Sequence, residues 1–267
     1  MPEIKIMLLL GYGIAAAIAL FSLFVQKRSV ERGFGYFALV LYAVHTWMVA
    51  RNFFSAPFGN PESLILFSWF LMGCYLWLRR NIATPLLPIF IFSGTFLLIL
   101  TSFSTPLSIP SGPASHSPLF PIHLMGAIFG GGLFAVAALL SLFFLLQVRQ
   151  LKTRKTFWML KRLPALETLE RFLDHDLRFG FGLMTLGLLT GAFWAHEYFA
   201  THWQWDANQV WALTTWVLYG CAIYLRESKF FAGKFWAYFI LISGFLVLGS
   251  FVLANLMMAR PHHFVGG

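Results

Sequence analysis

The side chains best suited to chemistry in this sequence are tryptophan and histidine, and many of them fall in one stretch. Residues 194–216 read WAHEYFATHWQWDANQVWALTTW and carry five of the ten tryptophans of the chain. His196, His202 and Asp206 lie among these rings. Neither an ordinary surface loop nor an ordinary hydrophobic span has this composition, so this stretch, here named the Trp-rich segment, is the first candidate for a functional site.

Neutral imidazole is a common metal ligand and one of the usual axial ligands of haem iron. A zinc site of the HExxH type needs tighter spacing, because His196 and His202 are six residues apart and would lie on different faces of a helix. A large flat ligand fits better, with imidazoles from separate segments on its two sides and indole rings around it. The residue types therefore favour non-covalent haem b.

Structural roles for the same residues stay open. Tryptophan anchors spans at membrane interfaces, which accounts for one or two of the rings. Asp206 precedes Gln209 by three positions, the capping-box spacing, and is suited to begin a helix. A capped helix start would fix the loop before it and present Trp203 and Trp205 to a ligand.

The elements that must position these residues are membrane helices. Of 267 residues, 59% are hydrophobic and 11% charged, with a mean hydropathy of +0.74, far from a soluble domain. Windows long enough to cross ~30 Å of hydrocarbon recur along the chain, and no cleavable signal is expected. We predict an all-α polytopic bundle, a single membrane domain over 1–267. Its eight transmembrane helices are expected at about 6–26, 34–52, 63–78, 85–103, 119–147, 179–200, 207–225 and 234–258.

Basic residues set the orientation. Sixteen of the 19 Lys and Arg residues fall in alternate connections on one side, including a basic loop at 148–178. That side is expected to be cytoplasmic, so both termini and the Trp-rich segment are expected on the outer, periplasmic side. The net charge of +9 is then explained by basic residues that set the orientation of the spans and are attracted to the lipid bilayer, and no nucleic-acid partner is expected.

In this topology the histidines gather toward the outer face, which has little lysine or arginine. His175 is the cytoplasmic exception, whereas seven of the eight lie toward the outside: His45, His116, His123, His196, His202, His262 and His263. Any one of them is tolerated at an interface, but seven together favour a ligand.

Cys74 and Cys221 have no CxxC spacing and are expected to be small buried hydrophobes. Trp69 and Trp236 are expected to be span anchors.

The stretch GLMTLGLLTGAFWAHEYFATHWQWDANQVWALTTWVLYG resembles the WWD domain of the CcsA/ResC family, the haem-handling membrane subunit of System II cytochrome c biogenesis. NPESLILFSW and NLMMARPH are similar to two further motifs of that family. The number of predicted spans also agrees, so the resemblance covers most of the chain.

The resemblance implies an outer-face haem platform formed by Trp194, Trp203, Trp205, Asp206 and Trp211. It also implies two axial ligands, His123 and His262; the family's second ligand follows an asparagine by seven positions, as His262 follows Asn255, so His263 is not expected to bind iron. Additional haem contacts are expected among His45, His196, His202, Arg51 and Arg260. The two arginines would face the haem propionates or else lie at the interface as snorkelling side chains.

The function implied is the presentation of haem for thioether attachment to the CxxCH motif of apocytochrome c, as part of a cytochrome c haem lyase with a CcsB/ResB-type membrane partner. The expected location is the bacterial inner membrane, or the thylakoid membrane in a plastid. Positioning of the haem vinyl groups would supply the catalysis.

Departures from the family keep a second hypothesis open. Ala207, Asn208 and Gln209 replace the family's Pro-Lys-Glu, and Tyr224 stands where the family carries a histidine at the inner end of span seven. These favour a divergent haem-binding protein without ligation activity, such as a carrier, a sensor or a redox subunit. A third hypothesis, a haem-free transporter or assembly factor, requires a polar pathway near the bilayer midplane, where the spans offer little besides Thr, Ser and Gly.

Overall fold

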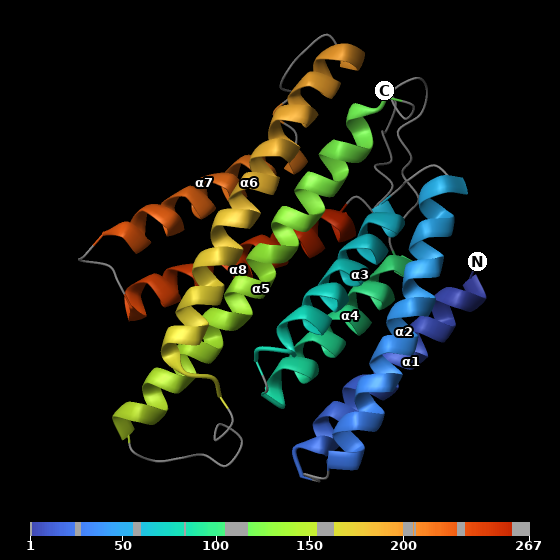
Figure 1. The fold of residues 1–267 in the computed structure, drawn as a ribbon. Coiled ribbons are helices and arrows are strands. Elements are labelled where there is room, and N and C mark those ends of the chain that lie inside the picture. Colours follow the sequence, from blue (N-terminus) through green and yellow to red (C-terminus); the bar gives the residue numbers. More distant parts are fainter. Residues whose placement is uncertain are drawn as a thin grey trace.

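The computed structural model of the protein describes residues 2–24, 28–55, 60–82, 84–104, 117–153, 163–199, 205, 207–228 and 233–257. Within these residues the chain is entirely helical (Figure 1). The helices are α1 (Pro2–Ser22), α2 (Arg28–Ser55), α3 (Asn60–Leu78), α4 (Leu86–Ser104), α5 (Leu119–Thr153), α6 (Leu166–Phe199), α7 (Ala207–Glu227) and α8 (Lys234–Met257). The predicted all-α polytopic bundle is confirmed.

Length and composition make most of these helices suitable for crossing a membrane. In the described residues, α1 to α6 each contain an apolar stretch of at least 18 residues, and α8 contains a shorter one, Lys234–Gly249. A helix rises 1.5 Å per residue, so a stretch of 18 residues or more reaches across most or all of the ~30 Å hydrocarbon layer. The chain is therefore a multi-pass membrane protein.

Two helices extend into the segment predicted as the basic loop, residues 148–178. α5 continues to Thr153 and α6 already begins at Leu166. Leu169, Leu173 and Leu177 are buried at helical spacing together with Asp176, whereas Arg171 and Arg178 are exposed. The sixth helix thus begins before the predicted span 179–200, because a hydropathy window averages over buried and exposed faces, and the cytoplasmic place of 148–178 stays a prediction.

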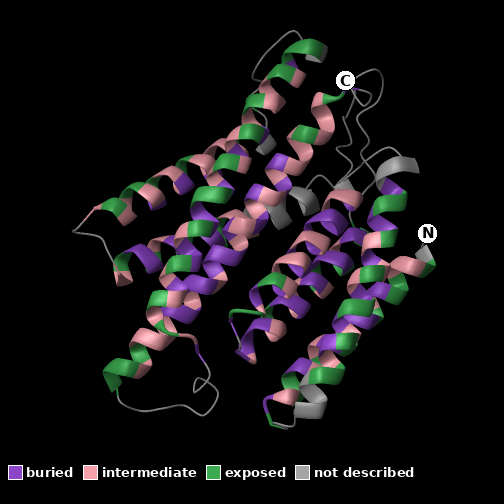
Figure 2. Cartoon of the chain, viewed as in Figure 1, coloured by how far each residue is buried: buried purple, intermediate pink, exposed green. Residues whose placement is uncertain are grey.

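The helices form two groups of four (Figure 1). In the first group α1 and α3 each pack against α2 and α4; in the second, α5 and α7 each pack against α6 and α8. α3 and α5 join the groups, where the Phe70 and Phe129 rings stack with centroids 4.5 Å apart. Buried residues gather on α3, α4 and α5, whereas α1, α2 and α6 turn more of their surface outward (Figure 2).

The closest helix pair is α5 with α6, and four glycines make the approach possible. A Cβ on Gly126 would lie 2.8 Å from the Cα of Gly187, and one on Gly130 would lie 3.0 Å from the Met184 nitrogen. Gly180 lies in the same row, where the Tyr219 hydroxyl donates to the Gly130 carbonyl at 2.6 Å. Small residues let membrane helices pack backbone to backbone. We call Gly126, Gly130, Gly180 and Gly187 the glycine contact.

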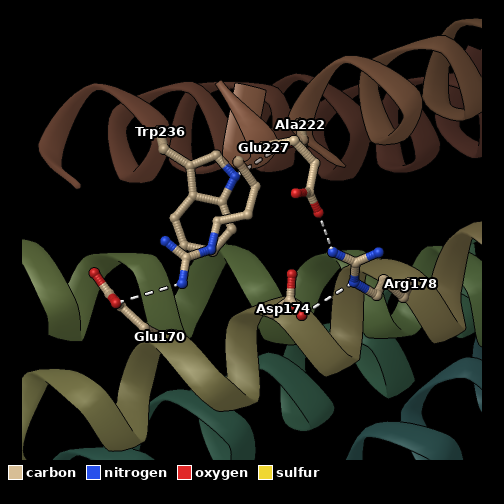
Figure 3. A network of polar contacts seen from close by, with 7 residues as sticks. Glu170, Asp174, Arg178, Ala222, Glu227 and Trp236 are labelled. Atoms are coloured by element: carbon tan, nitrogen blue, oxygen red, sulfur yellow. Dashed lines mark hydrogen bonds and ion pairs between the residues drawn. The ribbon is translucent and has the colours of Figure 1, made fainter. Parts of the chain in front are cut away.

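Ion pairs join the first half of α6 to the end of α7 (Figure 3). Arg178 binds Asp174 at 3.0 Å and Glu227 at 2.6 Å, and Arg226 reaches Glu170 at 3.5 Å. These charges are partly exposed, so each pair contributes little on its own.

Trp236 shows where one expectation was wrong. It was predicted to anchor a span at the interface, but it is fully buried, donates from Nε1 to the Ala222 carbonyl at 2.8 Å, and lies beneath the Arg226 guanidinium. The expectation for Cys221 is also wrong, because this side chain is exposed on α7, whereas Cys74 is partly buried. Apolar composition alone does not tell whether a side chain faces another helix or the lipid.

The glycine contact yields a stability prediction. Gly126→Ala places a methyl group against backbone atoms of α6, which cannot rotate away, so it should destabilise the fold by about 1–3 kcal/mol. Gly94→Ala is the matched control, because a Cβ there meets nothing within 4 Å. Thermal unfolding of the purified protein in detergent should show a lower midpoint for Gly126→Ala alone. Equal midpoints for the two variants would contradict the close approach of α5 and α6.

Candidate functional site

His123 lies in the first turns of α5, at the end of the helix pair where α6 finishes. Its Nδ1 is 2.7 Å from the Gly187 carbonyl oxygen of α6, and its side chain is partly buried. The imidazole is stacked on the Trp194 indole, with ring centroids 6.2 Å apart and planes inclined by 10°. The structure therefore brings together one predicted axial ligand and one predicted platform residue.

A single face of α6 forms this arrangement. Gly187, Gly191, Trp194 and Glu197 follow one another at helical spacing of three or four residues, so they face the same neighbour. Gly187 and Gly191 lie against the His123 ring, and Trp194 contacts both His123 and Phe120. The glycine contact holds the two helices close enough for a short imidazole to reach the backbone of α6.

Ser117 and Glu197 close the end of the pair at which α6 finishes. The Ser117 hydroxyl donates to the Glu197 carboxylate at 3.2 Å and accepts from the Leu119 backbone N–H at 3.3 Å. Ser117 thereby caps α5, and the nearby carboxylate complements the positive end of the helix dipole. Sequence reasoning missed both residues, although a serine followed by proline before an apolar run is a recognisable helix start.

Trp205 holds an unusual backbone conformation just before α7. Its φ is 57°, in the left-handed region that bulky side chains avoid, and its side chain is 72% exposed. Such a conformation costs of order 1 kcal/mol or more and is found most often at functional sites. A strained backbone that exposes the Trp205 indole is consistent with the predicted place of this residue in the platform.

The other tryptophans of the segment have different surroundings. Trp211 is 37% exposed at the start of α7. Trp216 instead ties α7 to α6, because its Nε1 donates to the Thr185 hydroxyl at 2.8 Å and its ring stacks on Phe181. Trp216 is thus a packing residue within the described helices. Trp69, predicted to be a span anchor, is partly buried and donates to the Thr46 hydroxyl at 2.9 Å.

His45 and Arg51 belong to the first group of helices, whereas His123 and Trp194 belong to the second. His45 is fully buried, with Nδ1 3.0 Å from the Tyr12 hydroxyl and Nε2 without a partner. Arg51 lies over the Trp47 ring, 5.6 Å from its centroid. His196, another predicted contact, is exposed near the end of α6. The haem contacts of these three residues stay predictions.

Several predicted site residues lie outside the described part of the chain. These are the second axial ligand and four further contacts: His262, Trp203, Asp206, His202 and Arg260. The predicted pairing of His123 with His262 and the capping role of Asp206 therefore stay predictions.

The backbone of Trp205 yields a direct comparison. Trp205→Gly and Trp205→Ala remove the same ring, but only alanine keeps the Cβ that strains a positive φ. The glycine variant should be the more stable of the two by on the order of 1 kcal/mol, read from thermal unfolding in detergent. If the alanine variant is equally stable, Trp205 does not carry this strain.

Comparison with known proteins places these residues in a family. The chain is similar to proteins named cytochrome c biogenesis protein CcsA from Guillardia theta and from Prochlorococcus marinus strain MIT 9312. The first is 27% identical over 79% of this chain and 76% of the relative, and the second is 27% identical over 79% and 75%. The relative from Pyropia yezoensis is 25% identical over 86% of this chain and 83% of its own length.

The sequence model of the family described as cytochrome C assembly protein matches residues 58–259. The matched region contains α3 to α8, with His123, Gly191, Trp194 and Trp205. α1 and α2, with Tyr12 and His45, precede it. Because the match covers well over half of its length, this chain belongs to the cytochrome C assembly protein family.

Proposed function

We propose that this protein takes part in cytochrome c maturation by binding haem at the outer end of α5 and α6 and presenting it there. One observation carries the proposal: His123 lies at this end, held by the Gly187 carbonyl and the Trp194 ring. The relatives, whose names state cytochrome c biogenesis, support the process.

The residues present fit haem as the bound substrate. An imidazole supplies a nitrogen ligand for the iron, and indole rings cover the faces and edges of a flat apolar macrocycle. Trp194 lies beside His123, and Trp205 and Trp211 offer exposed rings in the same Trp-rich segment. His262 is the proposed second ligand. In this proposal the protein binds, orients and shields the haem, and haem supplies the vinyl groups to which thioether bonds form.

Attachment needs partners that this chain would meet in the membrane. The proposed partners are a CcsB/ResB-type membrane subunit and an apocytochrome c with a CxxCH motif. The proposed site is the bacterial inner membrane or a thylakoid membrane, in agreement with relatives from cyanobacteria and algae. Together the subunits would act as a cytochrome c haem lyase.

One observation favours the alternative of haem binding without ligation. Tyr224, at the position where the resembling family has an inner histidine, is 75% exposed on α7. A carrier, sensor or redox subunit would need the outer haem site alone.

Deletion of the gene separates these two functions. A synthase subunit is required for every covalent c-type cytochrome of its compartment, so the deletion strain should lose haem-stained c-type bands after denaturing electrophoresis. Complementation with the wild-type gene is the control. Full c-type staining in the deletion strain would reject the ligation role and leave haem binding without ligation.

Haem ligation itself is tested on purified protein. Wild-type protein from haem-replete cells should carry six-coordinate b-type haem in its absorption spectrum. His123→Ala and His262→Ala should each lose haem or become five-coordinate, because one axial nitrogen is gone, and free imidazole should restore part of the signal.

His175→Ala and His263→Ala are matched controls, since His175 is exposed on the other half of α6 and His263 is not a proposed ligand. Both should resemble wild type. A wild-type protein that stays colourless and cannot be reconstituted with haem would refute haem binding. A six-coordinate spectrum in both His123→Ala and His262→Ala would refute the ligand assignment.

A further inference from the structure

The His123 ring is held on three sides by α6. Nδ1 meets the Gly187 carbonyl at 2.7 Å, one ring face lies along Trp194, and the ring edge lies over Gly191. We infer that Gly187 and Gly191 are positioning residues that fix His123 in one tautomer and one orientation, so that it binds haem iron through Nε2. This inference rests on the proposed function.

The tautomer follows from the chemistry of the partner. A carbonyl oxygen has no hydrogen to donate, so the nitrogen facing it must carry the proton. Nδ1–H therefore donates to Gly187, and in the neutral ring Nε2 keeps its lone pair. A hydrogen bond at one imidazole nitrogen sets which nitrogen binds a metal, and it also makes that nitrogen more basic.

Gly191 makes room for the ring. A Cβ at this position would lie 2.5 Å from Nδ1, 2.7 Å from Cε1 and 3.3 Å from Cγ of His123. Real Cβ atoms essentially never come within 3.0 Å of such neighbours, so alanine at 191 must displace the imidazole from the Gly187 carbonyl. Gly187 itself approaches α5, because a Cβ there would lie 2.8 Å from the Ala127 nitrogen.

The orientation follows from two contacts acting together. The hydrogen bond fixes one atom of the ring, and stacking on Trp194 within 10° of parallel fixes its plane. Because both contacts already fix the His123 side chain, it loses little conformational entropy when iron binds, and this preorganisation favours binding. Trp194 thus orients the ligand in addition to contacting haem.

The first test needs no haem. Protein labelled with ¹⁵N-histidine should give, for His123 in the haem-free state, a protonated Nδ1 and an unprotonated Nε2 in nitrogen NMR. The resonances are assigned by their loss in His123→Ala. Gly191→Ala should shift them to the averaged values of a mobile imidazole. A protonated Nε2 with an unprotonated Nδ1 in wild type would overturn the inference, whatever the haem content of the protein.

The second test measures haem affinity. Gly191→Ala should weaken haem binding about tenfold or more, the usual cost of losing a partner behind a metal ligand, and free imidazole should restore the six-coordinate spectrum. Gly182→Ala is the matched control on the same helix, because a Cβ there meets nothing within 4 Å, and it should bind haem like wild type. Haem affinity of Gly191→Ala equal to that of Gly182→Ala would overturn the inference.

A double variant separates displacement of the ligand from general damage to the fold. In a His123→Gly background supplied with imidazole, adding Gly191→Ala should change haem affinity less than twofold, because no ring remains to be displaced. An equally large loss in that background would assign Gly191 a structural role alone and overturn the inference. If wild type binds haem and His123→Ala loses it while Gly191→Ala does not, the proposed function stands and only the positioning role fails.

Discussion

The backbone-to-backbone approach of α5 and α6 is the constraint on which the rest of the site depends. Four glycines bring the two helices so close that a side chain at any of them would collide with the neighbouring helix or with Tyr219. At this separation an imidazole from α5 reaches a carbonyl oxygen in α6. At a wider spacing the His123 ring would have no contact with α6 to fix its orientation. Close packing of small residues also matters for the helix pair itself, because helices in a membrane gain no hydrophobic energy by associating with one another.

The same helix pair links the site to the two ends of the molecule. Ser117 and Glu197 join α5 to α6 at the end where α6 finishes, and Arg178 and Arg226 join α6 to α7 at the other end. α5 also carries the contact with α3 that joins the two groups of helices. The first group contributes a separate buried polar pair, Tyr12 with His45, from two helices that precede the region matched by the family. His45 thus has a partner within its own group.

The sequence alone predicted the helical class and the approximate spans, which follow from long apolar windows. The resemblance implied roles for His123 and Trp194; the structure brings these two residues together, and their roles stay predictions. It did not predict that Gly187 and Gly191 hold His123, because their contact joins residues 64 or more positions apart, and glycine carries no hydropathy signal of its own. It misjudged Trp236 and Cys221, since a helix in a membrane can be apolar on both its inward and its lipid-facing sides. It also missed that the sixth helix begins at Leu166, before the predicted span, because a hydropathy window averages the buried leucines with the charged residues around them.

The most direct measurement of the central claim is an experimental structure of the haem-loaded protein in a lipid nanodisc, at a resolution that shows side chains. The account predicts haem at the outer end of α5 and α6, with iron bonded to Nε2 of His123, Nδ1 still on the Gly187 carbonyl and the ring still stacked on Trp194. Haem bound at another place in the bundle, or iron bonded to His123 through Nδ1 with the Gly187 contact broken, would contradict it.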